Sequence, residues 1–468
     1  MWSTLGEKSS FLSPRYRRMD PEDPDRECLL PQSKRLGEKV RKYKRPEKAP
    51  IRRSLWINTS LLIIGDILGA GIIELPGNLR VLGWGFGIPS IVIFLVISYY
   101  LGVLVSRLAS MFSSALTFGD LAEPSCGRIG YIVAHWSQQI YLVLTCGLYV
   151  LLASKSLQLM LYDYELCQPI AGLIIAAIFL IPAQLRNLHE ISFIALLSFL
   201  CIVGYILICL HEMSGNGQEG GGGTTMSIAE DTDFASFSSA LMGIVFAFSG
   251  IEVYLEFIAE MKDPENFYKA LRFSLGTVGL VYICVSSYTY WLFGQDTPPV
   301  LTMVIKQGTP LRVANGLLLV HLVATYCIKQ QVVLRAAQVS ISPKNANSTS
   351  FAAIFQWFAF SVVMVLVSWL LANAIPFFSD FCSLLGAFMD TTLCIILPIT
   401  IALQAHRLNF AYLGITELPF LKFMVVFGVF VALLGCIGTT KQLVDHWDKF
   451  GYPFSCMEVD PSDTSEFF

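Results

Sequence analysis

The chain has 468 residues, of which 54% are hydrophobic and 14% are charged, and its formal net charge is −3. Soluble globular proteins carry about 25% charged residues, so the composition excludes an ordinary soluble protein and indicates a membrane protein with many spanning segments. Fifteen of the 32 Lys and Arg residues precede Trp56, which means that the small net charge conceals a strongly basic N-terminal segment.

Residues 1–55 are polar and contain no apolar stretch of the kind found in a cleavable signal peptide. We expect them to form a disordered, basic cytoplasmic arm, because they offer few apolar side chains for a core. The basic cluster before Trp56 predicts contact with anionic lipid head groups, and a role in topology alone explains it equally well. The stretch Asp25–Leu30 fits an acidic dileucine sorting signal, which favours a vacuolar or lysosomal membrane and leaves the plasma membrane open.

A helix needs about 20 mostly apolar residues to cross a bilayer. The sequence contains eleven such segments, so we expect an all-α integral membrane protein with eleven transmembrane helices. In chain order the segments are 56–79, 87–108, 131–160, 170–186, 192–211, 235–259, 271–293, 311–330, 351–373, 380–404 and 419–439.

The basic residues indicate the orientation of these segments. An odd number of spans puts the two termini on opposite sides, and 25 Lys and Arg residues then fall on the side of the N-terminus against five on the other. Since basic residues concentrate in cytoplasmic segments, we expect the N-terminus in the cytoplasm and the tail 441–468 outside. The outer segment 212–234 is glycine-rich and is expected to be a flexible tether between the halves 56–211 and 235–404, with 405–440 carrying the eleventh helix.

Two glycine-containing stretches, Gly65–Pro76 and Phe246–Glu252, interrupt long apolar segments at corresponding places in the two halves. Such paired interruptions point to the binding site of a transporter. Glycine allows the backbone to unwind and approach a ligand closely. We therefore expect both helices to break here and to use freed backbone groups as ligands.

Four motifs follow one another in the order found in the amino acid/auxin permease family, which the chain resembles from Asn58 to about Gly438. They are Gly69-Ala70-Gly71-Ile72-Ile73-x-Leu75-Pro76, then Phe246-Ala247-Phe248-Ser249-Gly250 with Glu260-Met261-Lys262-Asp263-Pro264, then Tyr290-x-x-Phe293-Gly294, and finally Ile375-Pro376-Phe377-Phe378 with Leu397-Pro398. The resemblance implies a leucine-transporter-type fold, in which five helices repeat as an inverted five and one further helix is peripheral.

In such a fold, the amides of Gly69, Ala70 and Gly71 begin a half-helix and bind the α-carboxylate of an amino acid, because helix N-termini favour anions. The unwound segment with Phe248, Ser249 and Gly250, together with Glu252, is expected to hold the α-ammonium group. Alternatively, the glycines serve only close helix packing.

Charged residues inside membrane segments are usually functional. Asp66 is the first candidate for the coupling proton or a substrate ammonium group, and a solvated residue without a coupling role is the alternative. A sodium site would instead use helix-1 carbonyls near Ile67 and the hydroxyl of Thr325, and this small supply of hydroxyls favours protons.

Three further charged residues need an explanation. Glu74 is expected toward an outer vestibule. Lys155 and Asp390 lie mid-span and need partners, and the sequence leaves open whether they pair with each other, with Asp66 or with Glu252.

These features predict a secondary active transporter that moves amino acids by alternating access, with protons as the coupling ion. A sodium-coupled transporter and an amino-acid-sensing receptor with little flux are the alternatives. The sequence shows no nucleophile–base cluster, metal-ligand set or nucleotide loop, so we expect no enzymatic activity, cofactor, metal or nucleic-acid partner. The twelve Cys residues have no paired spacing, and we interpret them as small packing residues.

Overall fold

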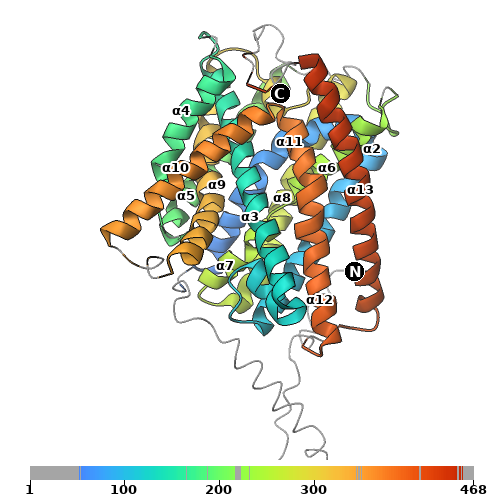
Figure 1. Ribbon diagram of the computed structural model, residues 1–468. Helices are drawn as coiled ribbons and strands as arrows, with labels where there is room; N and C mark the ends of the chain where they lie inside the picture. Colours follow the sequence, from blue (N-terminus) through green and yellow to red (C-terminus); the bar gives the residue numbers. More distant parts are fainter. Residues whose placement is uncertain are drawn as a thin grey trace, which may run out of the picture. The chain divides into compact units, whose positions relative to one another are not determined.

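The computed structural model describes residues 52, 54–164, 166–186, 188–216, 223–230, 232–343, 345, 348, 350–410, 413–450, 453–454 and 456. Almost all of the expected arm, with its dileucine signal, and the end of the C-terminal tail lie outside this set. The described residues confirm the all-α class, since they form helices (Figure 1) and contain no β-strand beyond an isolated bridge between Ser54 and Met261.

The main helices are α2 (Trp56–Met111), α3 (Phe118–Met160), α4 (Gln168–Leu180), α5 (Leu188–Asn216), α6 (Phe234–Ala247), α7 (Tyr254–Glu260), α8 (Phe267–Phe293), α9 (Thr309–Ile341), α10 (Phe351–Ala374), α11 (Phe378–Leu385), the π-helix η7 (Gly386–Ile396), α12 (Leu397–Arg407) and α13 (Glu417–Phe450). Short 3₁₀ turns occur at η2 (Pro182–Gln184), η3 (Ile251–Val253), η4 (Pro264–Asn266), η5 (Gly294–Asp296) and η6 (Leu301–Val304).

Within the described residues, nine helices are long and apolar enough to cross a membrane, and the shorter stretch Gln168–Gln184 occupies the place of the fourth expected span. The first two expected spans form a single helix, α2, whose 56 residues kink at Gly83. Helical structure is therefore found at all eleven predicted segments, whereas the count of eleven separate spanning helices stays a prediction.

The helices pack so that α2 lies along α8 and α6, and α9 lies along both α3 and α5. The last helix, α13, contacts α6, α11, η7 and α12 and lies at the edge of the bundle in Figure 1. Many large apolar side chains on the outer helix surfaces are exposed, among them Val426 and Leu433 of α13. A bilayer favours such an apolar exterior.

The kink of α2 is held by the segment that precedes α6. Gly83 has a φ of 66°, and a Cβ on this residue would lie 2.2 Å from the carbonyl oxygen of Ser227. The amides of Trp84 and Gly85 donate to the carbonyl oxygens of Thr225 (3.0 Å) and Met226 (2.9 Å). The last part of the expected outer tether is thus hydrogen-bonded to α2, while residues 217–222 lie outside the described residues.

One pair of cysteines corrects the interpretation of all of them as packing residues. Cys167, which precedes α4, forms a disulfide with Cys456, 289 residues further along the chain. Phe454 lies beside this link, since its ring centroid is 6.0 Å from that of Trp369 and its amide donates to the carbonyl oxygen of Asn373. A pairing over such a distance leaves no local spacing pattern, which is why the sequence did not indicate it.

Candidate functional site

The predicted break between Phe246 and Glu252 is present. The helix α6 ends at Ala247, and η3 and α7 continue the chain after three non-helical residues. Gly250 has a φ of 149°, a conformation that favours glycine. A Cβ at this position would lie 2.8 Å from Cγ1 of Ile67, so the glycine also allows α2 to approach the break.

The predicted break in the first segment is absent. The backbone of α2 is helical from Gly65 to Pro76, and its one non-helical residue is Gly83. Amides inside a helix are engaged with carbonyl groups of the preceding turn. Therefore the amides of Gly69, Ala70 and Gly71 are not free for a carboxylate in this conformation, and their role in substrate binding stays a prediction.

The glycines of α2 instead admit neighbouring side chains. A Cβ on Gly69 would lie 2.3 Å from Nε2 of His321, and a Cβ on Gly71 would lie 2.3 Å from the hydroxyl oxygen of Tyr282. That hydroxyl lies within hydrogen-bonding distance of the carbonyl oxygens of Ile67 (2.6 Å) and Ala247 (3.0 Å). Tyr282 thus connects α2 to the last turn of α6.

A buried ion cluster joins the two halves of the chain next to the break. The Lys329 ammonium of α9 pairs with Asp66 of α2, 3.1 Å from Oδ2, and with Oε1 of Glu252 in η3. The exposed fractions are 1% for Lys329, 5% for Asp66 and 0% for Glu252. Asp66 and Glu252, which the sequence indicated as site residues, are therefore brought together by Lys329, which the sequence did not indicate.

Lys329 was not expected in the site, because the predicted span ended at residue 330 and the lysine was counted among the cytoplasmic basic residues. In the structure α9 continues to Ile341. Gln330 and Gln331 are buried as well, so the polar residues at this point lie inside the bundle. The apolar residues Val332, Val333 and Leu334 that follow were the available signal that the helix continues.

A third carboxylate, Asp390, adjoins the cluster through a cysteine. The thiol of Cys394 lies 3.7 Å from Oε2 of Glu252 and 3.7 Å from Oδ1 of Asp390. Both Asp390 and Cys394 belong to the π-helix η7, and π-helical turns within α-helices are frequent at functional sites. Oδ2 of Asp390 and Oδ1 of Asp66 accept no hydrogen bond from the described residues.

The cluster has more acidic than basic groups. With Asp66, Glu252 and Asp390 ionised and Lys329 protonated, the four groups carry two uncompensated negative charges. Buried charges without compensation are costly in free energy. The arrangement is therefore suited to take up a further cation, either a proton or an ammonium group.

Two further charged residues named from the sequence are Lys155, whose partner the sequence left open, and Glu74. Lys155 is buried in α3, with an exposed fraction of 6%, but the cation that pairs with Asp66 and Glu252 is Lys329. Glu74 is 1% exposed, and its Oε1 would be 3.1 Å from a Cβ on Gly243 of α6. It is thus packed between helices rather than lining an open outer vestibule.

The residues expected for a sodium site already have protein partners. The carbonyl oxygen of Ile67 accepts from Tyr282. The hydroxyl of Thr325 donates to the carbonyl oxygen of Leu322 in its own helix, at 3.0 Å. One turn away, His321 is fully buried, with Nδ1 2.8 Å from Oγ of Ser198 and no hydrogen-bond partner for Nε2 among the described residues.

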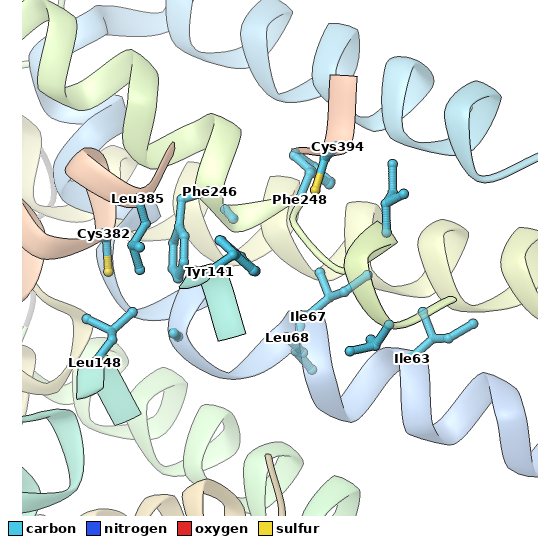
Figure 2. Close-up of a cluster of buried hydrophobic side chains, with 14 of the residues drawn as sticks. Ile63, Ile67, Leu68, Tyr141, Leu148, Phe246, Phe248, Cys382, Leu385 and Cys394 are labelled. Carbon is cyan, nitrogen blue, oxygen red and sulfur yellow. The ribbon is translucent and has the colours of Figure 1, made fainter. Parts of the chain in front are cut away.

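The break is also fixed from α3 and enclosed by apolar side chains. Nε2 of Gln138 donates to the carbonyl oxygen of Glu252 (2.6 Å) and to Oε1 of Glu256 (2.9 Å). Figure 2 shows Ile67 of α2 beside the break between α6 and α7, with side chains of α3, α11 and η7 nearby. The enclosing side chains include Tyr141, Leu148, Phe246, Phe248, Cys382 and Leu385, all of which are buried.

The family model for transmembrane amino acid transporter proteins matches residues 52–441. The amino acid transporter AVT1D of Arabidopsis thaliana is 22% identical over 389 residues, covering 81% of this chain and 67% of that protein. The N amino acid transport system protein of Neurospora crassa is 24% identical over 424 residues, covering 87% of this chain and 89% of that protein.

Among solved structures, the closed conformation of Mhp1, a nucleobase-cation-symport-1 family transporter with bromovinylhydantoin bound, superposes with a TM-score of 0.55 at 16% identity. The match covers 91% of this chain and 99% of that one. At this identity the likeness concerns the fold alone. It agrees with the leucine-transporter-type arrangement that the sequence motifs imply.

Proposed function

Because the chain belongs to the family of transmembrane amino acid transporters, we propose that it is a secondary active transporter that moves an amino acid across a membrane by alternating access and is driven by protons. The observation that carries this proposal is the buried cluster of Lys329 with Asp66 and Glu252 beside the α6–α7 break. The cluster joins the two halves of the chain, whose relative movement gives alternating access.

Protons are favoured over sodium by the contents of the cluster. The Lys329 ammonium already lies against Asp66, so a sodium ion at the same carboxylate would meet a like charge in a medium of low dielectric constant. Asp66 and Asp390 each keep one carboxylate oxygen without a hydrogen-bond donor. A proton on either residue reduces the uncompensated negative charge without displacing the lysine.

The same charges favour certain substrates. An excess of carboxylates suits the α-ammonium group, and it favours neutral or cationic amino acids over dicarboxylic ones. The backbone carbonyls of Phe248, Ser249 and Gly250 lie at the break and can bind that group. Those of Phe248 and Gly250 also accept hydrogen bonds from the Ser98 hydroxyl (3.2 Å) and the Val253 amide (3.3 Å). The α-carboxylate would bind the amides of Gly69, Ala70 and Gly71 once α2 unwinds, because these amides are engaged within the helix in the structure.

The disulfide supports the orientation expected from the basic residues. Disulfides persist in oxidising compartments and are rare in the cytosol, so the end of the bundle with Cys167 and Cys456 faces the lumen or the exterior. The end of α13 and the helix α7 lie at opposite ends of the bundle in Figure 1, and Ser54 hydrogen-bonds to the end of α7. We infer that the N-terminus is cytoplasmic, in a vacuolar, lysosomal or plasma membrane.

The experiment that tests this function is uptake of radiolabelled amino acids by proteoliposomes under an imposed proton gradient or an imposed sodium gradient. We expect proton-driven uptake that Asp66→Asn abolishes. The matched control, Asp163→Asn, removes an exposed surface carboxylate (side chain 54% exposed) and should leave uptake intact. Uptake driven only by sodium would contradict the coupling ion, and substrate binding without uptake would favour the amino-acid-sensing receptor.

A further inference from the structure

A groove of about 490 Å³ opens on the bundle surface where the start of α2 meets the first turns of α8. Its lining includes Trp56 of α2 and, from α8, Lys269, Arg272, Phe273, Gly276 and Leu280. These α8 positions recur at intervals of three and four residues, so they form a single face of the helix. Nothing in the candidate transport site uses this surface.

Gly276 leaves the middle of the groove without a side chain. A Cβ on Gly276 would meet no atom within 4 Å, whereas a Cβ on Gly279, on the packed face of the same helix, would lie 2.4 Å from Cδ1 of Leu95. Phe273 and Leu280 flank the open position and are 54% and 65% exposed. The floor of the groove is therefore apolar and faces the surroundings of the bundle.

The end of the groove is cationic. Lys269 and Arg272 line it, and no acidic residue is among its lining residues. Both cations can bind a phosphate group, and arginine can bind it bidentately through two N–H donors. Trp56 lies at the same end, and tryptophan is enriched where membrane helices meet the head-group region.

The length of this face matches one leaflet of a bilayer. The twelve residues from Lys269 to Leu280 span about 17 Å along the helix, and half of the hydrocarbon core is about 15 Å. A phosphate held at the cationic end would leave an acyl chain lying over Gly276. A small soluble anion would make no use of the apolar floor.

We propose that the groove binds one anionic phospholipid, with its phosphate on Lys269 and Arg272 and an acyl chain over Gly276 between Phe273 and Leu280. The lipid lies against the first turn of α2, the helix that carries Asp66 ten residues further on. It thereby stabilises the packing of α2 on α8 at the end of the bundle where both helices begin. This inference does not depend on the coupling ion or the transported substrate.

Native mass spectrometry of the full-length protein in detergent tests the proposal, with phosphatidylglycerol, phosphatidylcholine or inorganic phosphate added. We expect retention of one phosphatidylglycerol in preference to phosphatidylcholine. Each basic residue adds to the free energy of binding at an anionic lipid surface. Removing two of them, with Lys269→Gln and Arg272→Gln, should therefore weaken phosphatidylglycerol binding about 30-fold. Gly276→Leu should also weaken phosphatidylglycerol binding, although both charges are kept. The control is the double variant Lys262→Gln with Arg128→Gln at two exposed residues, which should leave binding unchanged.

A second measurement uses the unmodified protein and so does not require any variant to fold. Photoactivatable phosphatidylglycerol should label the peptide that contains residues 269–280. Labelling confined to other helices would overturn the proposal. Retention of phosphatidylglycerol by both groove variants, or displacement of the lipid by inorganic phosphate alone, would also overturn it.

Discussion

Nζ of Lys329 and Oδ2 of Asp66 are 3.1 Å apart in the interior of the bundle, although 263 residues separate them in the chain. The same ammonium pairs with Glu252, so one side chain of α9 connects α2 of the first half with the broken helix of the second. Any movement that separates α2 from α7 must therefore break the contact of Lys329 with Asp66 or with Glu252, or move the Lys329 side chain. We therefore expect the protonation of this cluster to influence the relative position of the halves.

The cluster gives a first prediction. Lys329→Met should lower the thermal unfolding midpoint in detergent and abolish uptake, because it leaves two buried carboxylates without a cation, a loss of about 3–5 kcal/mol. A variant that adds Asp66→Asn, Glu252→Gln and Asp390→Asn should recover the midpoint, since no charge of the cluster is then left unpaired, but it should stay inactive. The exposed Lys262→Met serves as control, and a Lys329→Met protein with full uptake would contradict the coupling role.

The break between α6 and α7 gives a second prediction. Gly250→Ala places a side chain at a φ of 149° and 2.8 Å from Ile67. Strain of this kind costs about 1–3 kcal/mol, and we expect a lower unfolding midpoint together with slower uptake. Gly215→Ala, where a Cβ meets nothing within 4 Å, is the control. Equal midpoints for the two variants would show that the conformation of Gly250 is not required.

The break in the second half illustrates what the sequence could predict. Apolar runs identify the helices because their length fits a bilayer, and Gly250 marks the α6–α7 break because only glycine readily adopts its φ. The glycines of α2 were ambiguous, since close packing and unwinding favour the same residue. Their pattern gave no means of detecting that His321 and Tyr282 occupy the space beside them.

The ion cluster shows where sequence reasoning ended. Asp66, Glu252 and Asp390 could be singled out because acidic residues inside membrane segments are rare. Lys329 followed an apolar run and preceded two glutamines, a pattern that is also typical of a helix end at the cytoplasm. Which of these charges pair depends on contacts between helices far apart in the chain, and no local pattern encodes them.

The packing of α2 on α9 gives a third prediction. Gly69→Ala should displace the imidazole of His321, because the new Cβ would lie 2.3 Å from Nε2, and the hydrogen bond to Ser198 would be lost. We expect a lower unfolding midpoint that His321→Ala partly restores in the double variant, since two residues in contact do not act additively. Gly65→Ala, one turn earlier, is the control, because its Cβ would be 3.9 Å from Oγ of Ser198. Additive effects of the two substitutions would rule out this contact.

The disulfide gives a fourth prediction, which also tests the orientation. Cys167→Ser should lower the unfolding midpoint, as loss of a disulfide typically costs 2–5 kcal/mol, and Cys456→Ser should have the same effect because both remove the same link. The exposed free cysteine Cys284 provides the control, Cys284→Ser, with no expected change.

The orientation can be tested on the same two cysteines. In sealed right-side-out vesicles from cells, a membrane-impermeant reductant followed by an impermeant maleimide should label Cys167 and Cys456 without permeabilisation, if the protein resides in the plasma membrane. For a vacuolar or lysosomal protein, the same labelling should require opening of the organelle. Labelling that is possible only from the cytosolic face would reverse the orientation, because the covalent link of α4 to the C-terminal tail would then lie in a reducing compartment.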